Sequence, residues 1–200
     1  ERCVFGRGFS EFEASSSFFG GEQDNFFISL AMYPEMAAEA FNLITQLQIA
    51  RARVFIEEGV HAIAPGGDFS DSGGPMVSPS TIRDVFLPGM KALVDYCHQA
   101  GVPVLSHNCG NNWKIMDILV EAGYDSYQSI QSKTAEMDLK KLKERYGDDI
   151  ALWGGINIET LMEDRPAEVR EEVLYALRHA APGGGFILGT SNSVAYGSSY

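Results

Sequence analysis

The stretch Val102-Pro-Val-Leu-Ser-His-Asn-Cys-Gly-Asn-Asn-Trp113 contains the most informative turn of this 200-residue chain. Its first half, residues 102–105, is a short apolar run, which predicts a buried strand. Its second half is polar and leads into a helix-like run over 113–122. His107 and Cys109 stand two residues apart in the turn after this strand, so their side chains can point into one space. Imidazole nitrogen and thiolate are ligands that zinc prefers, and the turn is therefore a candidate zinc half-site.

The same order of elements recurs on both sides of this stretch. An amphipathic helix ends at a glycine, a short apolar strand follows, and a polar loop leads into the next helix. Strands are predicted near residues 61–65, 102–106, 124–130, 150–154 and 186–189, and the N-terminal stretch could hold a sixth. Strands that alternate with amphipathic helices indicate right-handed βαβ units and a parallel sheet.

This α/β pattern suits either a doubly wound sheet or a (β/α)₈ barrel of the TIM type. The barrel is favoured, partly because no glycine-rich dinucleotide fingerprint follows any predicted strand. In both architectures the functional face lies at the carboxyl ends of the strands. Polar residues that directly follow the predicted strands are therefore the candidates for substrate contact: Asp68, Asp71, Ser72, His107, Gln128, Gln131, Asn157 and Asn192.

Each of these candidates also has an ordinary structural explanation. His107 and Cys109 could be a histidine bonded to a carbonyl and a cysteine packed beneath the loop. Asp71 and Ser72 lie in a glycine-rich segment, where aspartate, serine and glycine often serve only to form a turn. The amides of Gln128 and Gln131 could contact a polar ligand or simply face solvent.

Composition restricts the class of protein. A hydrophobic content of 45% supports one core, and no apolar run is long enough to span a membrane. The net charge of −12 disfavours nucleic acid as a partner and fits a cytoplasmic enzyme. The 3 cysteines are too few and too scattered for a disulfide framework, which predicts a reducing compartment.

Five segments together resemble the uroporphyrinogen decarboxylase superfamily. They are Asp71-Ser-Gly-Gly-Pro-Met-Val-Ser-Pro79, Phe86-Leu-Pro88, His107-Asn-Cys-Gly-Asn111, Trp153-Gly-Gly-Ile-Asn157 and Gly183-Gly-Gly-Phe-Ile-Leu-Gly189. The resemblance implies a (β/α)₈ barrel, of which this chain would supply roughly the third to eighth strands. Residues 1–200 are accordingly expected to form a single partial barrel of about six βα units that lacks the N-terminal strands. An unclosed sheet exposes strand edges, which makes a homo-oligomer possible.

The superfamily has two main branches, and the resemblance is closer to the corrinoid-dependent methyltransferases. Their signature is His-x-Cys-Gly, which His107 and Cys109 match as zinc ligands, with a distant cysteine as third ligand. The corresponding loop here has Asn192 near that position, so Asp68 or Asp71 is expected to complete the site. The resemblance implies methyl transfer between a small molecule and a corrinoid carried by a partner protein.

The other branch removes carboxyl groups from a tetrapyrrole without a cofactor. Ser72 matches a substrate-facing serine of these decarboxylases. Taken together with the strand-end positions, Asp71, Ser72 and His107 are the expected catalytic residues, whereas Asp68, Gln128, Gln131, Asn157 and Asn192 are expected to bind substrate. Decarboxylation is the alternative to methyl transfer, and a non-catalytic partial barrel is a third possibility.

Overall fold

A computed structural model describes residues 2–134, 136–194 and 196. Its main sheet has the strand order β1-β2-β5-β6-β7-β8, and every neighbouring pair is parallel. The strands are β1 (Phe5–Ser10), β2 (Ala62–Gly66), β5 (Leu105–His107), β6 (Ser126–Ile130), β7 (Ala151–Ile156) and β8 (Phe186–Thr190). The prediction of parallel strands in one sheet is confirmed, and the N-terminal stretch does hold the sixth strand.

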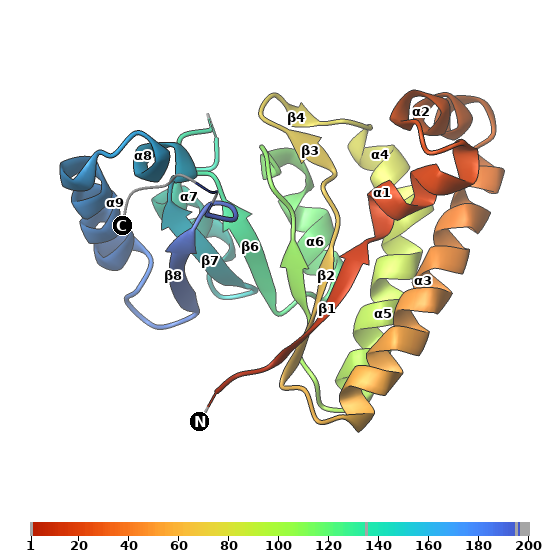
Figure 1. Cartoon of the computed structure of the whole chain (residues 1–200), viewed down its shortest axis with the longest axis horizontal. Helices are drawn as coiled ribbons and strands as arrows, with labels where there is room; N and C mark the ends of the chain where they lie inside the picture. The colour runs from red at the N-terminus through yellow and green to blue at the C-terminus, as the bar shows by residue number, and fades with distance from the viewer. Residues whose placement is uncertain (1, 135, 195, 197–200) are drawn as a thin grey trace.

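The helices pack around the outer face of this sheet, with α3 and α5 at one end and α7 to α9 at the other (Figure 1). The principal helices are α1 (Glu11–Ser16), α2 (Gln23–Met32), α3 (Pro34–Glu57), α5 (Leu87–Gln99), α6 (Met116–Ala122), α7 (Leu139–Tyr146), α8 (Ile158–Met162) and α9 (Pro166–His179). Shorter turns are η1 (Ser17–Phe19), α4 (Pro79–Thr81), η2 (Ile82–Phe86) and η3 (Trp113–Ile115). This arrangement is that of a partial TIM-type barrel.

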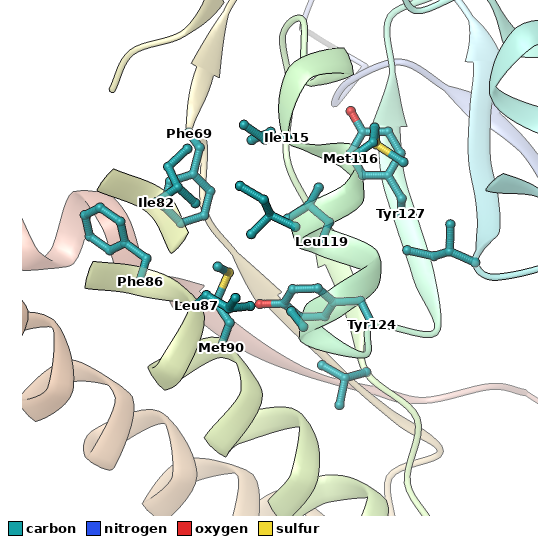
Figure 2. Packing of buried hydrophobic residues seen from close by; sticks show 14 of the residues in the cluster. Phe69, Ile82, Phe86, Leu87, Met90, Ile115, Met116, Leu119, Tyr124 and Tyr127 are labelled. Carbon is teal, nitrogen blue, oxygen red and sulfur yellow. The ribbon is translucent and has the colours of Figure 1, made fainter. Parts of the chain in front are cut away.

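The core lies between the sheet and the outer helices, and Figure 2 shows part of its packing. Phe86, at the end of η2, is fully buried. Its ring meets four other phenylalanine rings at centroid distances of 4.7 to 6.4 Å, namely those of Phe12, Phe26, Phe41 and Phe69. These aromatic contacts join α1, α2 and α3 to the segment after β2, and so fix the helices around the sheet.

The sheet is not closed in the part of the chain that the structure describes. β1 and β8 are its terminal strands, and each pairs with one neighbour only. The Phe5 and Trp153 rings, on β1 and β7, face each other across the interior with centroids 6.0 Å apart.

Among the helices that the structure describes, none combines the length and the apolar composition that a membrane-spanning segment requires.

Candidate functional site

Strand register brings the candidate residues to one rim. Ser10 on β1 pairs with Gly66 on β2, Gly66 pairs with His107 on β5, and His107 pairs with Gln128 on β6. The carboxyl ends of four strands therefore lie in a row. A cavity of about 610 Å³ opens beside this row, and its polar lining includes Arg7, Ser10, Asp68, His107, Gln128, Thr190, Asn192 and Ser193.

The His107 ring is oriented by the neighbouring strand. Its Nδ1 lies 2.6 Å from Oε1 of Gln128. Because a carboxamide oxygen only accepts, Nδ1 carries a proton, and in the neutral ring Nε2 presents a lone pair. Nε2 faces Asp68, whose Oδ1 lies 3.9 Å away. A histidine that donates one ring N–H to a carbonyl oxygen and leaves the other nitrogen free is prepared for a metal ion.

Cys109 is held against the same carboxylate. Its backbone N–H donates to Asp68 Oδ1 at 2.8 Å. Burial raises the pKa of the Cys109 thiol to about 12, and the negative charge of Asp68 and a hydrogen bond to it add to the effect. The thiol is therefore protonated at neutral pH, and a cation beside it would be needed to stabilise the thiolate.

The loop that carries Cys109 is tied down by buried amides. Asn108 Oδ1 accepts the backbone N–H of Phe69 at 2.9 Å, and the Asn108 carbonyl accepts the Tyr127 hydroxyl at 2.9 Å. The Asn112 side-chain amide donates to the Cys109 carbonyl at 2.8 Å. These hydrogen bonds join the loop to the segment after β2 and to β6, and so hold it in one conformation.

Gly110 is required by this packing. Its φ is +85°, and a Cβ there would lie 2.6 Å from the Asp71 carbonyl oxygen. Gly110→Ala is therefore expected to lower the free energy of unfolding by about 3 kcal/mol or more, since backbone strain and a clash add together. Gly101→Ala is the control, because its φ is +72° but a Cβ would meet nothing within 4 Å. Urea unfolding should show a loss of only about 1–2 kcal/mol for Gly101→Ala, and equal losses would contradict the clash.

Asp71 and Ser72 do not line the cavity, contrary to the prediction that they face it with His107. Both are exposed, in the turn between the short strands β3 (Ser70–Asp71) and β4 (Gly74–Pro75). Asp71 Oδ1 accepts the backbone N–H groups of Gly73 at 2.7 Å and Gly74 at 3.1 Å. The carboxylate closes its own turn, which is the structural alternative that the glycine-rich sequence left open.

Gln131 and Asn157 are also absent from the cavity lining. Gln131 Oε1 accepts the backbone N–H of Gly110 at 3.2 Å and so supports the Cys109 loop. Asn157 is buried and donates its side-chain amide to Glu172 Oε1 at 3.1 Å and to Ser132 at 3.1 Å. The prediction that Asn157 faces the same cavity as His107 is wrong, because its amide is drawn to the carboxylate on α9.

The structure does bring Asp68, Gln128 and Asn192 to the cavity that His107 lines. Asn192 is held by its own segment, since Thr190 Oγ1 donates to the Asn192 carbonyl at 2.6 Å. These three residues and His107 come from four different strand ends, as expected of residues at a barrel rim.

The N-terminal stretch adds residues that sequence reasoning missed. Arg7 lines the cavity from β1. Glu13, in the first turn of α1, is half-buried, and burial raises the pKa of its carboxyl. The sequence does contain a signal for a helix start here, because Ser10-x-x-Glu13 has the spacing of a capping box. In the structure, Ser10 Oγ accepts the Glu13 N–H at 3.3 Å.

The donor types at this rim fit zinc. His107 Nε2, the Cys109 thiol and the Asp68 carboxylate are the nitrogen, sulfur and oxygen donor types that zinc takes. The donors are not preassembled: among the described side chains, no group of three His, Cys, Asp or Glu is already arranged to hold a metal ion.

Solved structures of other proteins are similar to this chain in fold. A methyltransferase from Methanosarcina mazei is similar with a TM-score of 0.82 and 19% identity, over 98% of this chain and 55% of that chain. The chain thus spans about half the length of that methyltransferase. A dihydropteroate synthase from Anaplasma phagocytophilum gives a TM-score of 0.51 and 15% identity, over 94% of this chain and 67% of that chain. At such identities the likeness establishes the fold alone.

Sequence comparison identifies the family. A search of curated proteins gave no match. The family model described as uroporphyrinogen decarboxylase (URO-D) matches residues 9–199, nearly the whole chain. The same family was expected from the segments around Asp71, His107 and Trp153, and the partial barrel agrees with it. The chain therefore belongs to the uroporphyrinogen decarboxylase family.

Proposed function

We propose that this chain takes part in corrinoid-dependent methyl transfer, with His107 and Cys109 as zinc ligands. The observation that carries the proposal is the free Nε2 of His107, which faces Asp68 beside the Cys109 loop at the mouth of a cavity. The family and the similarity in fold to a methyltransferase support it. The substrates are a small methyl donor or acceptor and a corrinoid carried by a partner protein.

The chain's own residues prepare this chemistry. Gln128 keeps the proton on Nδ1 of His107, and Asp68 holds the backbone of Cys109 in place. Bound zinc supplies Lewis acidity, which stabilises a thiolate or polarises a methyl donor. Arg7 and Asn192 line the cavity and would hold the polar end of a small substrate. The cavity is lined by residues of all six strands of the open sheet, and a corrinoid partner would approach it there.

Zinc content is the first test. Wild-type protein purified without chelator is expected to contain about one zinc ion per chain, and Cys109→Ala is expected to lose it, because thiolate is the strongest donor present. Cys3→Ala is the matched control, since Cys3 is exposed and outside the site. Zinc affinity should also fall as the pH drops below neutral, because protons compete for imidazole and thiolate. Atomic emission spectroscopy measures the metal, and negligible zinc in the wild type would remove zinc from the proposal.

The reaction itself is tested with methylcobalamin and a panel of small thiols. Demethylation changes the corrin absorption spectrum, and His107→Ala and Cys109→Ala should abolish the change. Uroporphyrinogen III is assayed in parallel without added metal. Loss of its carboxyl groups, with no effect on methylcobalamin, would replace methyl transfer by the decarboxylase function.

A further inference from the structure

We propose that Ser129, on β6, is a positioning residue for the His107 site. Its backbone conformation directs Gln128 to the His107 ring, and its hydroxyl holds the loop that follows β8. Ser129 is not among the residues that line the cavity, so it acts through these neighbours. The reaction that it serves is the one proposed above, and in that respect this role rests on the proposed function, whereas the geometry does not.

Ser129 has an unusual backbone conformation for a residue of the interior. Its φ is +90°, and it is fully buried. Apart from glycines, Asp164 is the only other described residue with a positive φ, and it is exposed. Aspartate also tolerates this conformation better than serine does. A strained backbone costs free energy that the surrounding contacts must offset, and residues of this kind cluster at functional sites.

The strained residue lets β6 face the cavity and the core in turn. In a regular strand alternate side chains share a face, so Gln128 and Ile130 would point the same way. In this chain Gln128 lines the cavity, whereas Ile130 is fully buried in the hydrophobic core with Tyr127. The pairing of β6 with β7 also shifts register between Gln128 and Ile130. The change of direction is therefore made at Ser129, and it allows Gln128 Oε1 to lie 2.6 Å from His107 Nδ1.

The Ser129 hydroxyl ties β6 to the loop after β8. Its Oγ donates to the Ser191 carbonyl. Ser191 is fully buried, and its own N–H donates to the Ile156 carbonyl at 2.6 Å. Its Oγ accepts the Ile158 N–H at 3.0 Å, and its chain neighbour Asn192 lines the cavity. One hydrogen bond therefore joins the strand of the ring-orienting glutamine to the loop that carries Asn192.

Two substitutions at Ser129 separate the backbone from the hydroxyl. Ser129→Ala removes the hydroxyl and keeps a Cβ at the positive φ, whereas Ser129→Gly removes the hydroxyl and the strain together. Ser126 supplies the matched controls, because it is also buried on β6 and its Oγ has no hydrogen-bond partner. Urea unfolding should find Ser129→Gly more stable than Ser129→Ala. The order should be the reverse at position 126, where glycine only weakens the strand.

The orientation of Gln128 is measured through the His107 ring. NMR of the histidine ring nitrogens in the zinc-free protein, at about pH 8 where such rings are neutral, distinguishes a proton on Nδ1 from one on Nε2. The wild type, Ser129→Gly and Ser126→Ala should keep the Nδ1 proton. Ser129→Ala should shift the ring toward the Nε2 form, because the strain remains and the hydrogen bond that offsets it is lost. The His107→Ala spectrum assigns the signal.

The methylcobalamin reaction gives the second measurement. Ser129→Ala should lower kcat about tenfold, the lower end of what the partners of a metal-binding histidine contribute. Ser129→Gly should keep kcat. Both variants should raise KM for the small thiol about fivefold, as for the loss of one hydrogen bond, because each releases the loop that carries Asn192. Ser126→Ala should match the wild type in both constants.

The ring spectra decide the inference. Equal spectra for Ser129→Ala and the wild type would overturn it, and so would an equal shift in Ser129→Gly or Ser126→Ala. If Ser129→Ala does not fold, the order of stability is the expected one, and an Nε2 proton in Ser129→Gly is then the contradicting result. Unchanged KM in both Ser129 variants would remove the role of the hydroxyl. The expected spectra in a protein that does not demethylate methylcobalamin would end the proposed function and leave Ser129 as the residue that positions Gln128.

Discussion

Phe86→Ala is expected to lower the free energy of unfolding by about 3–5 kcal/mol, the usual range for truncating a buried phenylalanine. The Phe86 ring is fully buried, and four phenylalanine rings surround it. Alanine would leave a cavity bordered by α1, α2 and α3, and rings held in three helices cannot all move in to fill it. Urea unfolding of the zinc-free protein, followed by circular dichroism, measures the difference without any contribution from bound metal.

Phe18→Ala is the control for this prediction. Phe18 lies in η1, close in sequence to Phe12, but its side chain is 53% exposed. Its truncation should change the free energy of unfolding by no more than about 0.5 kcal/mol, as for most surface positions. A loss below about 1 kcal/mol for Phe86→Ala would mean that the aromatic cluster does not hold the helices to the sheet.

Glu11→Gln is expected to remove a large pH dependence of stability. Burial raises the pKa of the Glu11 carboxyl from 4.5 to about 8 in the folded chain. The folded state therefore binds a proton that the unfolded state releases between these values. The stability that this proton provides is fully present below pH 4.5 and is lost as the pH rises through 8. The expected loss from this one group is on the order of a few kcal/mol.

The measurement is the free energy of unfolding from pH 5 to pH 9 for the wild type and two variants. Glu11→Gln cannot ionise, so it should be more stable than the wild type at the alkaline end. Glu39→Gln, at an exposed position of α3, should follow the wild-type curve. Parallel curves for Glu11→Gln and the wild type would show that Glu11 does not hold its proton in the folded state.

Much of the fold could be predicted because strand signals are local. The apolar runs between glycines predicted strands near 61–65, 124–130, 150–154 and 186–189, and the structure has β2, β6, β7 and β8 there within a few residues. The central strand is shorter than expected. Residues 102–106 were predicted, whereas β5 is Leu105–His107 with a single bridge from Val104 to Ile63.

The site was only partly predictable, because its geometry depends on partners far apart in the sequence. The sequence identified His107 and Cys109 as a candidate pair, since both lie in one short turn. It did not show that Gln128 would orient the His107 ring, a contact that the register of β5 and β6 creates. The prediction that Asp71 faces the cavity was wrong, because its carboxylate accepts hydrogen bonds from the N–H groups of its own turn.

By itself, the sequence determined the βαβ order, the parallel sheet and the turn with His107 and Cys109, since each follows from residues adjacent in the chain. Only the tertiary structure decided that Gln128 would orient the His107 ring and that Asn157 would turn to Glu172. Both outcomes follow from the same physical cause. A buried polar side chain takes the nearest available partner, and packing of the whole chain decides which partner is near.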